Sequence, residues 1–214
     1  MTFANRTGTL KTAILAFAAW TLAAATGAAG QTPQEVLDRA VAHFEAGRVV
    51  ESAAEFDRLV TIRPTIAPQL WQRGIALYYA GRYEDCRKQF ELHRTVNPND
   101  VENAAWHFLC VARADSLAAA AAALLPVGPD ARVPMRQVYE LFRGRMTPAD
   151  VLSAAGADPG AQFFAQLYLG LFAEARGDRT RALEHITAAA NGRYASAGGY
   201  MHMVARVHLA ALRR

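Results

Sequence analysis

The sequence lacks runs of alternating apolar and polar residues of the kind expected of strands, and it contains only 9 prolines in 214 residues. Its composition is rich in alanine, which favours helices. We therefore predict an all-α fold. A chain of this length is sufficient for one sizeable domain.

Motifs that carry catalysis are also missing. The chain has no nucleophile beside a base, no paired carboxylates in a recognisable context and no glycine-rich phosphate loop before a helix. Its acidic residues, such as Glu35 and Glu84, fall mainly at expected helix starts or exposed helical positions. The sequence predicts a protein that is not an enzyme and needs no cofactor.

Basic charge is not concentrated on any one stretch. The chain has 23 lysines and arginines against 19 acidic residues, a net charge of +4. Arg6 and Lys11 lie in an N-terminal segment that we expect to be removed, which leaves a charge of about +2. Nucleic-acid binding requires a clustered basic face, so we predict no nucleic-acid partner.

Residues 1–30 have the features of a secretory signal peptide. Arg6 and Lys11 precede the uncharged run TAILAFAAWTLAAA, and small residues follow it. We expect cleavage after Ala29 or Gly30. A retained membrane anchor is the alternative, but the apolar core is shorter than the roughly 20 residues that span a bilayer. We therefore expect a periplasmic or secreted protein with no stable membrane span after cleavage.

Two stretches of the chain share a period of 34 residues, which is the period of the tetratricopeptide repeat (TPR). Three markers recur in the same order at this spacing: Gly47, Phe56 and Pro64, then Gly81, Phe90 and Pro98. Glycine tolerates the left-handed conformation at a helix end, so Gly47 and Gly81 are expected to end the first helix of each pair. Gly74 is expected to lie where the two helices of the second pair meet closely.

A third, degenerate repeat follows Pro98, with a first helix over residues 101–114 and an alanine-rich second helix over 116–125. Residues 126–161 depart from the period and predict an irregular helical section. The period returns at residue 162.

In the last repeat, Gly170 and Gly177 occupy the places of Gly74 and Gly81. A final helix should cover the end of the stack. The predicted organisation is a signal peptide (1–30), N-terminal repeats (31–125), an irregular section (126–161), and a C-terminal repeat with a capping helix (162–214).

Such helix pairs cannot bury their apolar faces alone, so they are expected to stack into a right-handed superhelical solenoid. The chain resembles bacterial TPR lipoproteins of the NlpI type in three stretches: RGIALYYAGR at 73–82, NPND at 97–100, and FFAQLYLGLFAEARGD at 163–178. The resemblance implies a periplasmic, dimeric scaffold that brings envelope proteases or cell-wall hydrolases to their substrates. The chain departs from that family in lacking the lipidated cysteine.

The concave face of a TPR stack is lined by the first helix of each pair. Mapping the repeats places seven apolar or aromatic residues there: Leu37, Phe44, Trp71, Ile75, Tyr78, Tyr79 and Trp106. Aromatic residues are common anchors of binding surfaces. We therefore expect a scaffold that binds a protein or peptide through this groove. The alternative is that half of these residues belong to the core.

Five basic residues are spread through the second repeat: Arg73, Arg82, Arg87, Lys88 and Arg94. Such side chains hold acidic peptide termini in some TPR domains. Their spacing scatters them around the helices, so we expect solvated faces instead.

Two other functions stay open. The groove could be filled by the chain's own terminal helix or by a second copy, so that self-association, for instance as a homodimer, is its main use. A small-ligand or metal carrier could use His107 with Cys110 and Cys86 with His93, which can share helix faces. No CxxC or HExxH spacing supports this, and we predict no metal site.

Cys86 and Cys110 are the only cysteines. We expect each to be a small buried side chain. A disulfide between them is the alternative in an exported chain.

Overall fold

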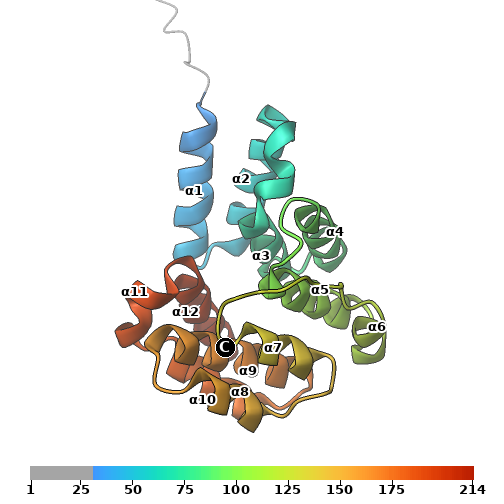
Figure 1. Ribbon diagram of the computed structural model, residues 1–214. Helices are drawn as coiled ribbons and strands as arrows, with labels where there is room; N and C mark the ends of the chain where they lie inside the picture. The colour runs from blue at the N-terminus through green and yellow to red at the C-terminus, as the bar shows by residue number, and fades with distance from the viewer. Residues whose placement is uncertain (1–30) are drawn as a thin grey trace, which may run out of the picture. The chain divides into compact units, whose positions relative to one another are not determined.

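The computed structural model of the protein describes residues 31–214 (Figure 1). Within these residues the chain forms α-helices, short 3-10 helices and no strand, which confirms the predicted all-α fold. The predicted signal peptide lies outside the described residues. Among the helices of the described part, none has the length and apolar character needed to cross a membrane.

The helices follow one another in chain order, and a longer loop over residues 123–134 separates α6 from α7. They are α1 (Pro33–Glu45), α2 (Val49–Ile62), η1 (Pro64–Gln69), α3 (Trp71–Tyr79), α4 (Tyr83–Arg94), α5 (Val101–Ala114), α6 (Leu117–Ala122), α7 (Met135–Phe142), α8 (Pro148–Ala155), α9 (Pro159–Ala175), α10 (Arg179–Ala189), η2 (Gly192–Tyr194), α11 (Ala195–Gly198) and α12 (Tyr200–Leu212).

Local sequence signals account for the ends of these helices. At the start of α1, the Thr32 hydroxyl accepts a hydrogen bond from the Glu35 backbone N–H, and the Glu35 carboxylate accepts one from the Thr32 N–H at 2.8 Å. This capping box satisfies two backbone donors that the helix leaves without partners. Gly47 and Gly81 follow α1 and α3 with φ of 72° and 76°, a conformation that glycine adopts without steric cost.

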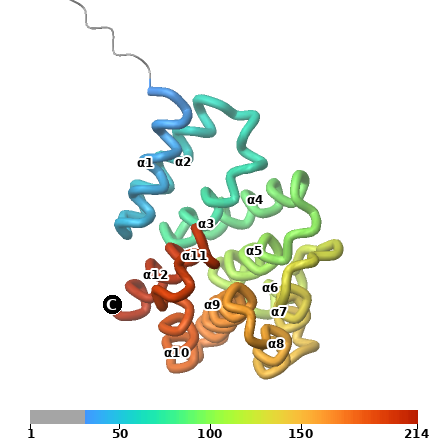
Figure 2. The backbone as a smooth tube through the Cα atoms, turned by 60° about the vertical axis from the view of Figure 1, so that its left-hand side comes forward, coloured from blue at the N-terminus to red at the C-terminus, as the bar shows by residue number. Residues whose placement is uncertain are grey.

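Helices next to each other in sequence also pack side by side. The pairs α1 with α2, α3 with α4, α4 with α5, and α9 with α10 make the most extensive contacts in residues 31–214. The chain then curves back, so that α12 lies against α10 and also reaches α1 (Figure 2). The last helix of the chain therefore packs against the first part of the fold.

Two glycines lie where paired helices approach closely. A Cβ atom added to Gly74 on α3 would lie 2.6 Å from the Phe90 ring on α4, and one added to Gly170 on α9 would lie 2.6 Å from Ile186 on α10. Real Cβ atoms do not approach other heavy atoms this closely. Each position therefore needs a residue without a side chain.

Replacing Gly74 by leucine is expected to lower the free energy of unfolding by about 1 to 3 kcal/mol, because the added side chain displaces Phe90 from the core. Urea denaturation followed by circular dichroism measures the change. Gly192→Leu is the matched control, since a Cβ at Gly192 meets no atom within 4 Å. Equal stability of the two variants would contradict the close packing at Gly74.

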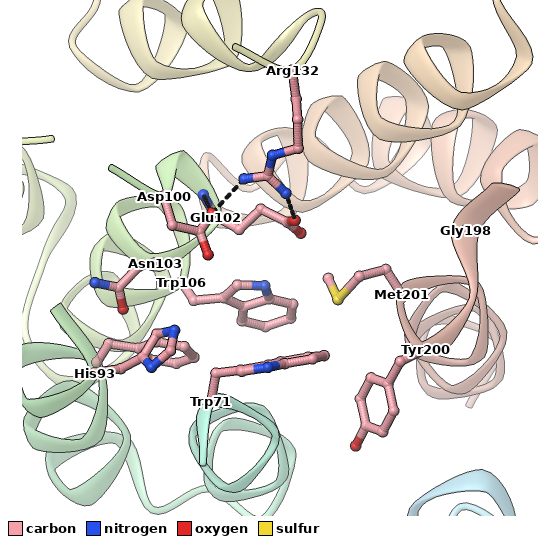
Figure 3. A pocket seen from close by; sticks show the side chains of 11 residues that line it. Trp71, His93, Asp100, Glu102, Asn103, Trp106, Arg132, Gly198, Tyr200 and Met201 are labelled. Atoms are coloured by element: carbon pink, nitrogen blue, oxygen red, sulfur yellow. Dashed lines mark hydrogen bonds and ion pairs between the residues drawn. The ribbon is translucent and has the colours of Figure 1, made fainter. Parts of the chain in front are cut away.

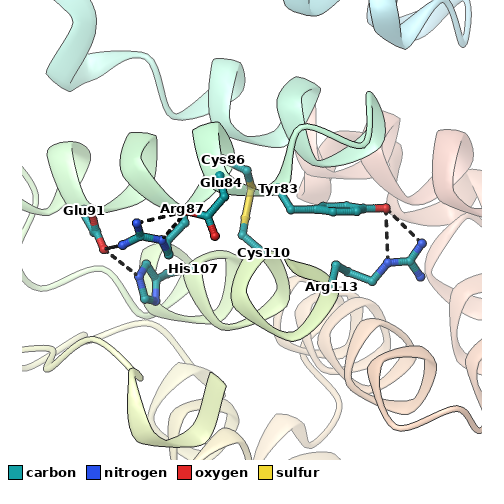
Figure 4. Close-up of a disulfide and its surroundings, with 8 residues drawn as sticks. All are labelled: Tyr83, Glu84, Cys86, Arg87, Glu91, His107, Cys110 and Arg113. Atoms are coloured by element: carbon teal, nitrogen blue, oxygen red, sulfur yellow. Dashed lines mark hydrogen bonds and ion pairs between the residues drawn. A yellow bond between two sulfur atoms is a disulfide. The ribbon is translucent and has the colours of Figure 1, made fainter. Parts of the chain in front are cut away.

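A disulfide joins Cys86 on α4 to Cys110 on α5, with a Cα–Cα distance of 5.9 Å (Figure 4). Both residues are fully buried. The expectation of two free, buried thiols is therefore wrong. The two helices pack against each other, which brings the cysteines within bridging distance, and spacing in the sequence alone does not determine that distance.

Candidate functional site

The predicted groove is not an open surface. Leu37, Trp71 and Tyr79 are half-buried, whereas the other four predicted groove residues are buried: Phe44, Ile75, Tyr78 and Trp106. Burial of these four residues, Trp106 among them, corrects the expectation that they lie on an open face available to a partner. All four belong to the hydrophobic core.

The C-terminal helix covers this face. The Tyr200 ring at the start of α12 stacks on Phe44 at 5.8 Å between centroids and meets Trp71 edge-on at 5.0 Å. Further along α12, His208 Nδ1 lies 3.0 Å from the Tyr79 hydroxyl. The chain's own terminal helix therefore occupies much of the face that the repeats were expected to leave open.

A cavity of about 300 Å³ remains beside α12 (Figure 3). Its walls come from α3, α4, α5, α11, α12 and the loop between α6 and α7. The lining residues are Trp71, Phe90, His93, Asp100, Glu102, Asn103, Trp106, Arg132, Gly198, Tyr200 and Met201. Two predicted groove residues, Trp71 and Trp106, are thus brought together at one site.

Aromatic packing holds the two indole rings. Trp106 stacks on Phe90 at 6.3 Å with an interplanar angle of 15°, and Tyr78 meets it edge-on at 5.4 Å. Trp71 is held by the edge-on contact with Tyr200. In Figure 3 the indole of Trp106 lies above that of Trp71, with Met201 and Tyr200 on the opposite side of the cavity from His93 and Asn103.

The third wall is charged and centres on Arg132. Arg132 Nη1 donates to Glu102 Oε1 at 2.6 Å, and Nη2 donates to Asp100 Oδ1 at 2.5 Å and to Asp130 Oδ2 at 2.7 Å. Nε donates to Asp130 Oδ1 at 3.0 Å. Three carboxylates therefore surround one guanidinium, and the cluster carries a formal charge of −2 when all are ionised.

The acidic residues of this cluster are held by α5 and α9. Asp100 caps α5, where its Oδ1 accepts a hydrogen bond from the Glu102 N–H at 3.0 Å. Tyr168 on α9 donates its hydroxyl to Glu102 Oε2 at 2.5 Å. Burial and then the neighbouring Asp100 carboxylate raise the pKa of Glu102, although the hydrogen bonds from Tyr168 and Arg132 act in the opposite direction.

Four lining side chains keep a polar atom without a hydrogen-bond partner among residues 31–214: His93 Nε2, Asn103 Oδ1, Trp106 Nε1 and the Tyr200 hydroxyl. The first three residues are only 5%, 3% and 1% exposed. Polar atoms buried this deeply almost always have partners, so their concentration around one cavity is unusual. His93 Nδ1 lies 2.7 Å from the Pro68 carbonyl oxygen, which can only accept a hydrogen bond. In the neutral ring the proton is therefore on Nδ1, and Nε2 keeps a lone pair.

Most of the basic residues of the second repeat are already neutralised. Arg73 and Arg82 both pair with Asp57, and Arg87 pairs with Glu84 and Glu91 (Figure 4). These side chains do not line the cavity.

The disulfide rules out the alternative of a metal site that uses both cysteines, because Cys86 and Cys110 use their sulfur atoms to bond each other. In the part of the chain that the structure describes, no group of three or more histidine, cysteine or acidic side chains is arranged to hold a metal ion.

Sequence reasoning identified the two tryptophans of the site, named His93 only as a ligand in the metal-carrier alternative, and missed the other polar residues. Asp100 directly precedes the predicted helix over 101–114 and is a residue type that favours the helix cap. Arg132, Tyr200 and Met201 reach the cavity only because distant segments fold against α3 and α5, and no local signal in the sequence marks them.

The described residues form an all-helical fold with a small cavity of aromatic and acidic character. Comparison of the chain with protein-family models and with curated protein sequences finds no match. The resemblance to TPR lipoproteins of the NlpI type stays a prediction.

Proposed function

We propose that this protein is a non-enzymatic scaffold of the TPR-like solenoid class, and that it binds a protein or peptide partner at the cavity between Trp71, Trp106 and Met201. One observation carries the proposal. Two indole rings, a charged wall and the unpartnered polar atoms of His93, Asn103 and Trp106, which are at most 5% exposed, lie at a single cavity.

The solenoid class is supported by features that recur from pair to pair. The first helix of three pairs ends before a glycine with positive φ: Gly47, Gly81 and Gly177. Gly74 and Gly170 pack in the same way against the second helix of their pairs. Repeats of this kind stack through nearest-neighbour contacts, as the consecutive helices of this chain do.

The size of the cavity favours a particular form of partner. About 300 Å³ is at the lower limit of ligand pockets, enough for a side chain and the adjoining backbone but not for a helix. We therefore expect a partner that inserts a projecting side chain of a flexible segment, with the remaining contacts on the surface around it.

Export to the periplasm or the exterior is supported by the disulfide, because such bonds persist in oxidising compartments and are rare in reducing ones. An envelope protease or a cell-wall hydrolase is the partner that the family resemblance suggests.

Tagged protein purified from its own host should bring the partner with it, and Trp71→Ala should lose that partner because it removes one aromatic wall of the cavity. Val50→Ala, at an exposed apolar residue of α2 away from the cavity, is the control and should retain it. Circular dichroism checks that both variants keep their helicity.

Two outcomes would contradict the proposal. Retention of the same partner by Trp71→Ala would place the binding surface elsewhere. Recovery of the protein alone, together with a mass in light scattering that rises with concentration, would favour self-association.

A further inference from the structure

We propose that the cavity binds a positively charged group, the guanidinium or ammonium of an arginine or lysine side chain in a peptide. This inference rests on the proposed function and names the chemistry that the same site recognises.

The charge of the site supports a cation. Asp100 and Glu102 line the cavity, and Asp130 adjoins them through Arg132. The single positive charge of Arg132 balances only one of the three negative charges of these carboxylates. Because these side chains are largely withdrawn from water, the remaining negative charge acts on a bound group more strongly than it would at an exposed surface.

The chain itself shows that this wall accepts a guanidinium. All three side-chain nitrogens of Arg132 donate to carboxylate oxygens of Asp100, Glu102 and Asp130. Arg132 is therefore engaged on its acidic partners and is not presented to an anionic ligand. An acidic group entering the cavity would meet the carboxylates without a compensating free cation.

The aromatic wall suits the same ligand. Indole faces attract guanidinium and ammonium groups through the ring quadrupole, and tryptophan is the most effective aromatic residue in this interaction. Trp71 and Trp106 both line the cavity, and their orientations are held by Tyr200 and Phe90.

The unpartnered polar atoms add hydrogen-bonding capacity of the matching kind. His93 Nε2 and Asn103 Oδ1 are acceptors, which pair with the N–H donors of arginine or lysine. Trp106 Nε1 is a donor and matches a backbone carbonyl beside the basic side chain. This combination favours a peptide over an isolated small cation.

Intrinsic fluorescence provides a direct test. The chain has three tryptophans, and two of them, Trp71 and Trp106, line the cavity. In the full chain carrying Trp20→Phe, both remaining indoles report on the site. We expect saturable fluorescence changes with the capped peptides Gly-Arg-Gly and Gly-Lys-Gly, weaker at high salt. Capped Gly-Gln-Gly and Gly-Glu-Gly should have no effect.

Glu102→Gln should weaken binding of the arginine peptide about tenfold or more, because it removes a charge but keeps the side-chain shape. Glu51→Gln on the exposed face of α2 is the matched control and should leave the affinity unchanged. If Glu102→Gln fails to fold by circular dichroism, Asn103→Leu replaces it as the cavity variant and should also weaken binding.

Two results with the peptides would overturn the inference: no binding of either basic peptide, or equal or tighter binding of the glutamine or glutamate peptide. An equal loss of affinity in Glu51→Gln and Glu102→Gln would also overturn it. So would tighter binding of agmatine than of the arginine peptide. Loss of the host partner in Trp71→Ala alongside any of these would leave the proposed function standing. Retention of that partner by Trp71→Ala would contradict both the proposed function and this inference.

Discussion

Replacing Cys86 and Cys110 together by alanine is expected to lower the free energy of unfolding by about 3 kcal/mol. The two cysteines are 24 residues apart, so their bond closes a loop that contains most of α4 and most of α5. Closing such a loop restricts the unfolded chain far more than the folded one. Urea denaturation of the oxidised protein and of the double variant measures the difference.

Reduction provides the control for this prediction. A reductant should shift the unfolding midpoint of the natural protein toward that of the Cys86→Ala, Cys110→Ala variant and should leave the variant unchanged. If oxidised and reduced protein unfold at the same urea concentration, the disulfide does not stabilise the fold. Protein from the natural host should carry no thiol that reacts after denaturation, if the chain is exported as we propose.

Acidification from pH 7.5 to pH 4.5 is expected to cost about 2 to 3 kcal/mol of stability through one residue, His208. His208 on α12 is 2% exposed. Burial, and then the charge of Arg113, lower its pKa to about 4 from the ordinary 6.5. The folded protein therefore favours the neutral ring, whereas the unfolded chain takes up a proton below pH 6.5.

The sign of the effect follows from these two pKa values. Stability from the neutral His208 is fully present above pH 6.5 and is lost as the pH falls toward 4. Lowered pKa values of His107 and His185, both caused chiefly by burial, act in the same direction. Burial raises the pKa values of Glu102 and Glu174, and these two carboxyls oppose the loss.

The groups around His208 come from three helices. The Tyr79 hydroxyl on α3 lies 3.0 Å from Nδ1, and Glu174 Oε2 on α9 lies 3.4 Å from Nε2 without hydrogen-bond geometry. Arg113 on α5 contributes the nearby positive charge. Protonation of His208 therefore places a charge in the contact that holds α12 against α3.

His208→Gln isolates this contribution, because an amide keeps a hydrogen-bonding side chain but does not titrate. Unfolding free energies of the natural protein and the variant are compared at pH 7.5 and pH 4.5. The natural protein should lose about 2 to 3 kcal/mol more than the variant over this interval. His202→Gln on the same helix controls for replacement of a histidine by an amide. Parallel losses in the natural protein and His208→Gln would contradict the assignment.

The packing of α12 over the predicted groove has the greatest consequence for function. Apolar and aromatic residues at helical spacing fit either a concave binding face or a core, and the two cannot be separated from one chain segment alone. Phe44 and Tyr78 became core residues because α12 and neighbouring helices pack on them. Trp106 is buried as well, but it and the half-buried Trp71 border the cavity that remains beside α12.

The sequence by itself determined the helices. Their ends depend on nearby residues, such as Thr32 with Glu35 at a helix start and Gly47 or Gly81 at a helix end. The predicted helix over 101–114 matches the observed α5. These signals act within one or two turns, so they can be read without the rest of the fold.

Only the tertiary structure decided where the cavity forms, that the two cysteines bond, and that α12 packs over the predicted groove. Arg132 lies about 30 residues from Asp100 and Glu102, and His208 lies 129 residues from Tyr79. Such contacts depend on how the stacked helices curve, and a small change in packing at each pair accumulates along the chain. The identity of the residues was present in the sequence, but the distances between them were not.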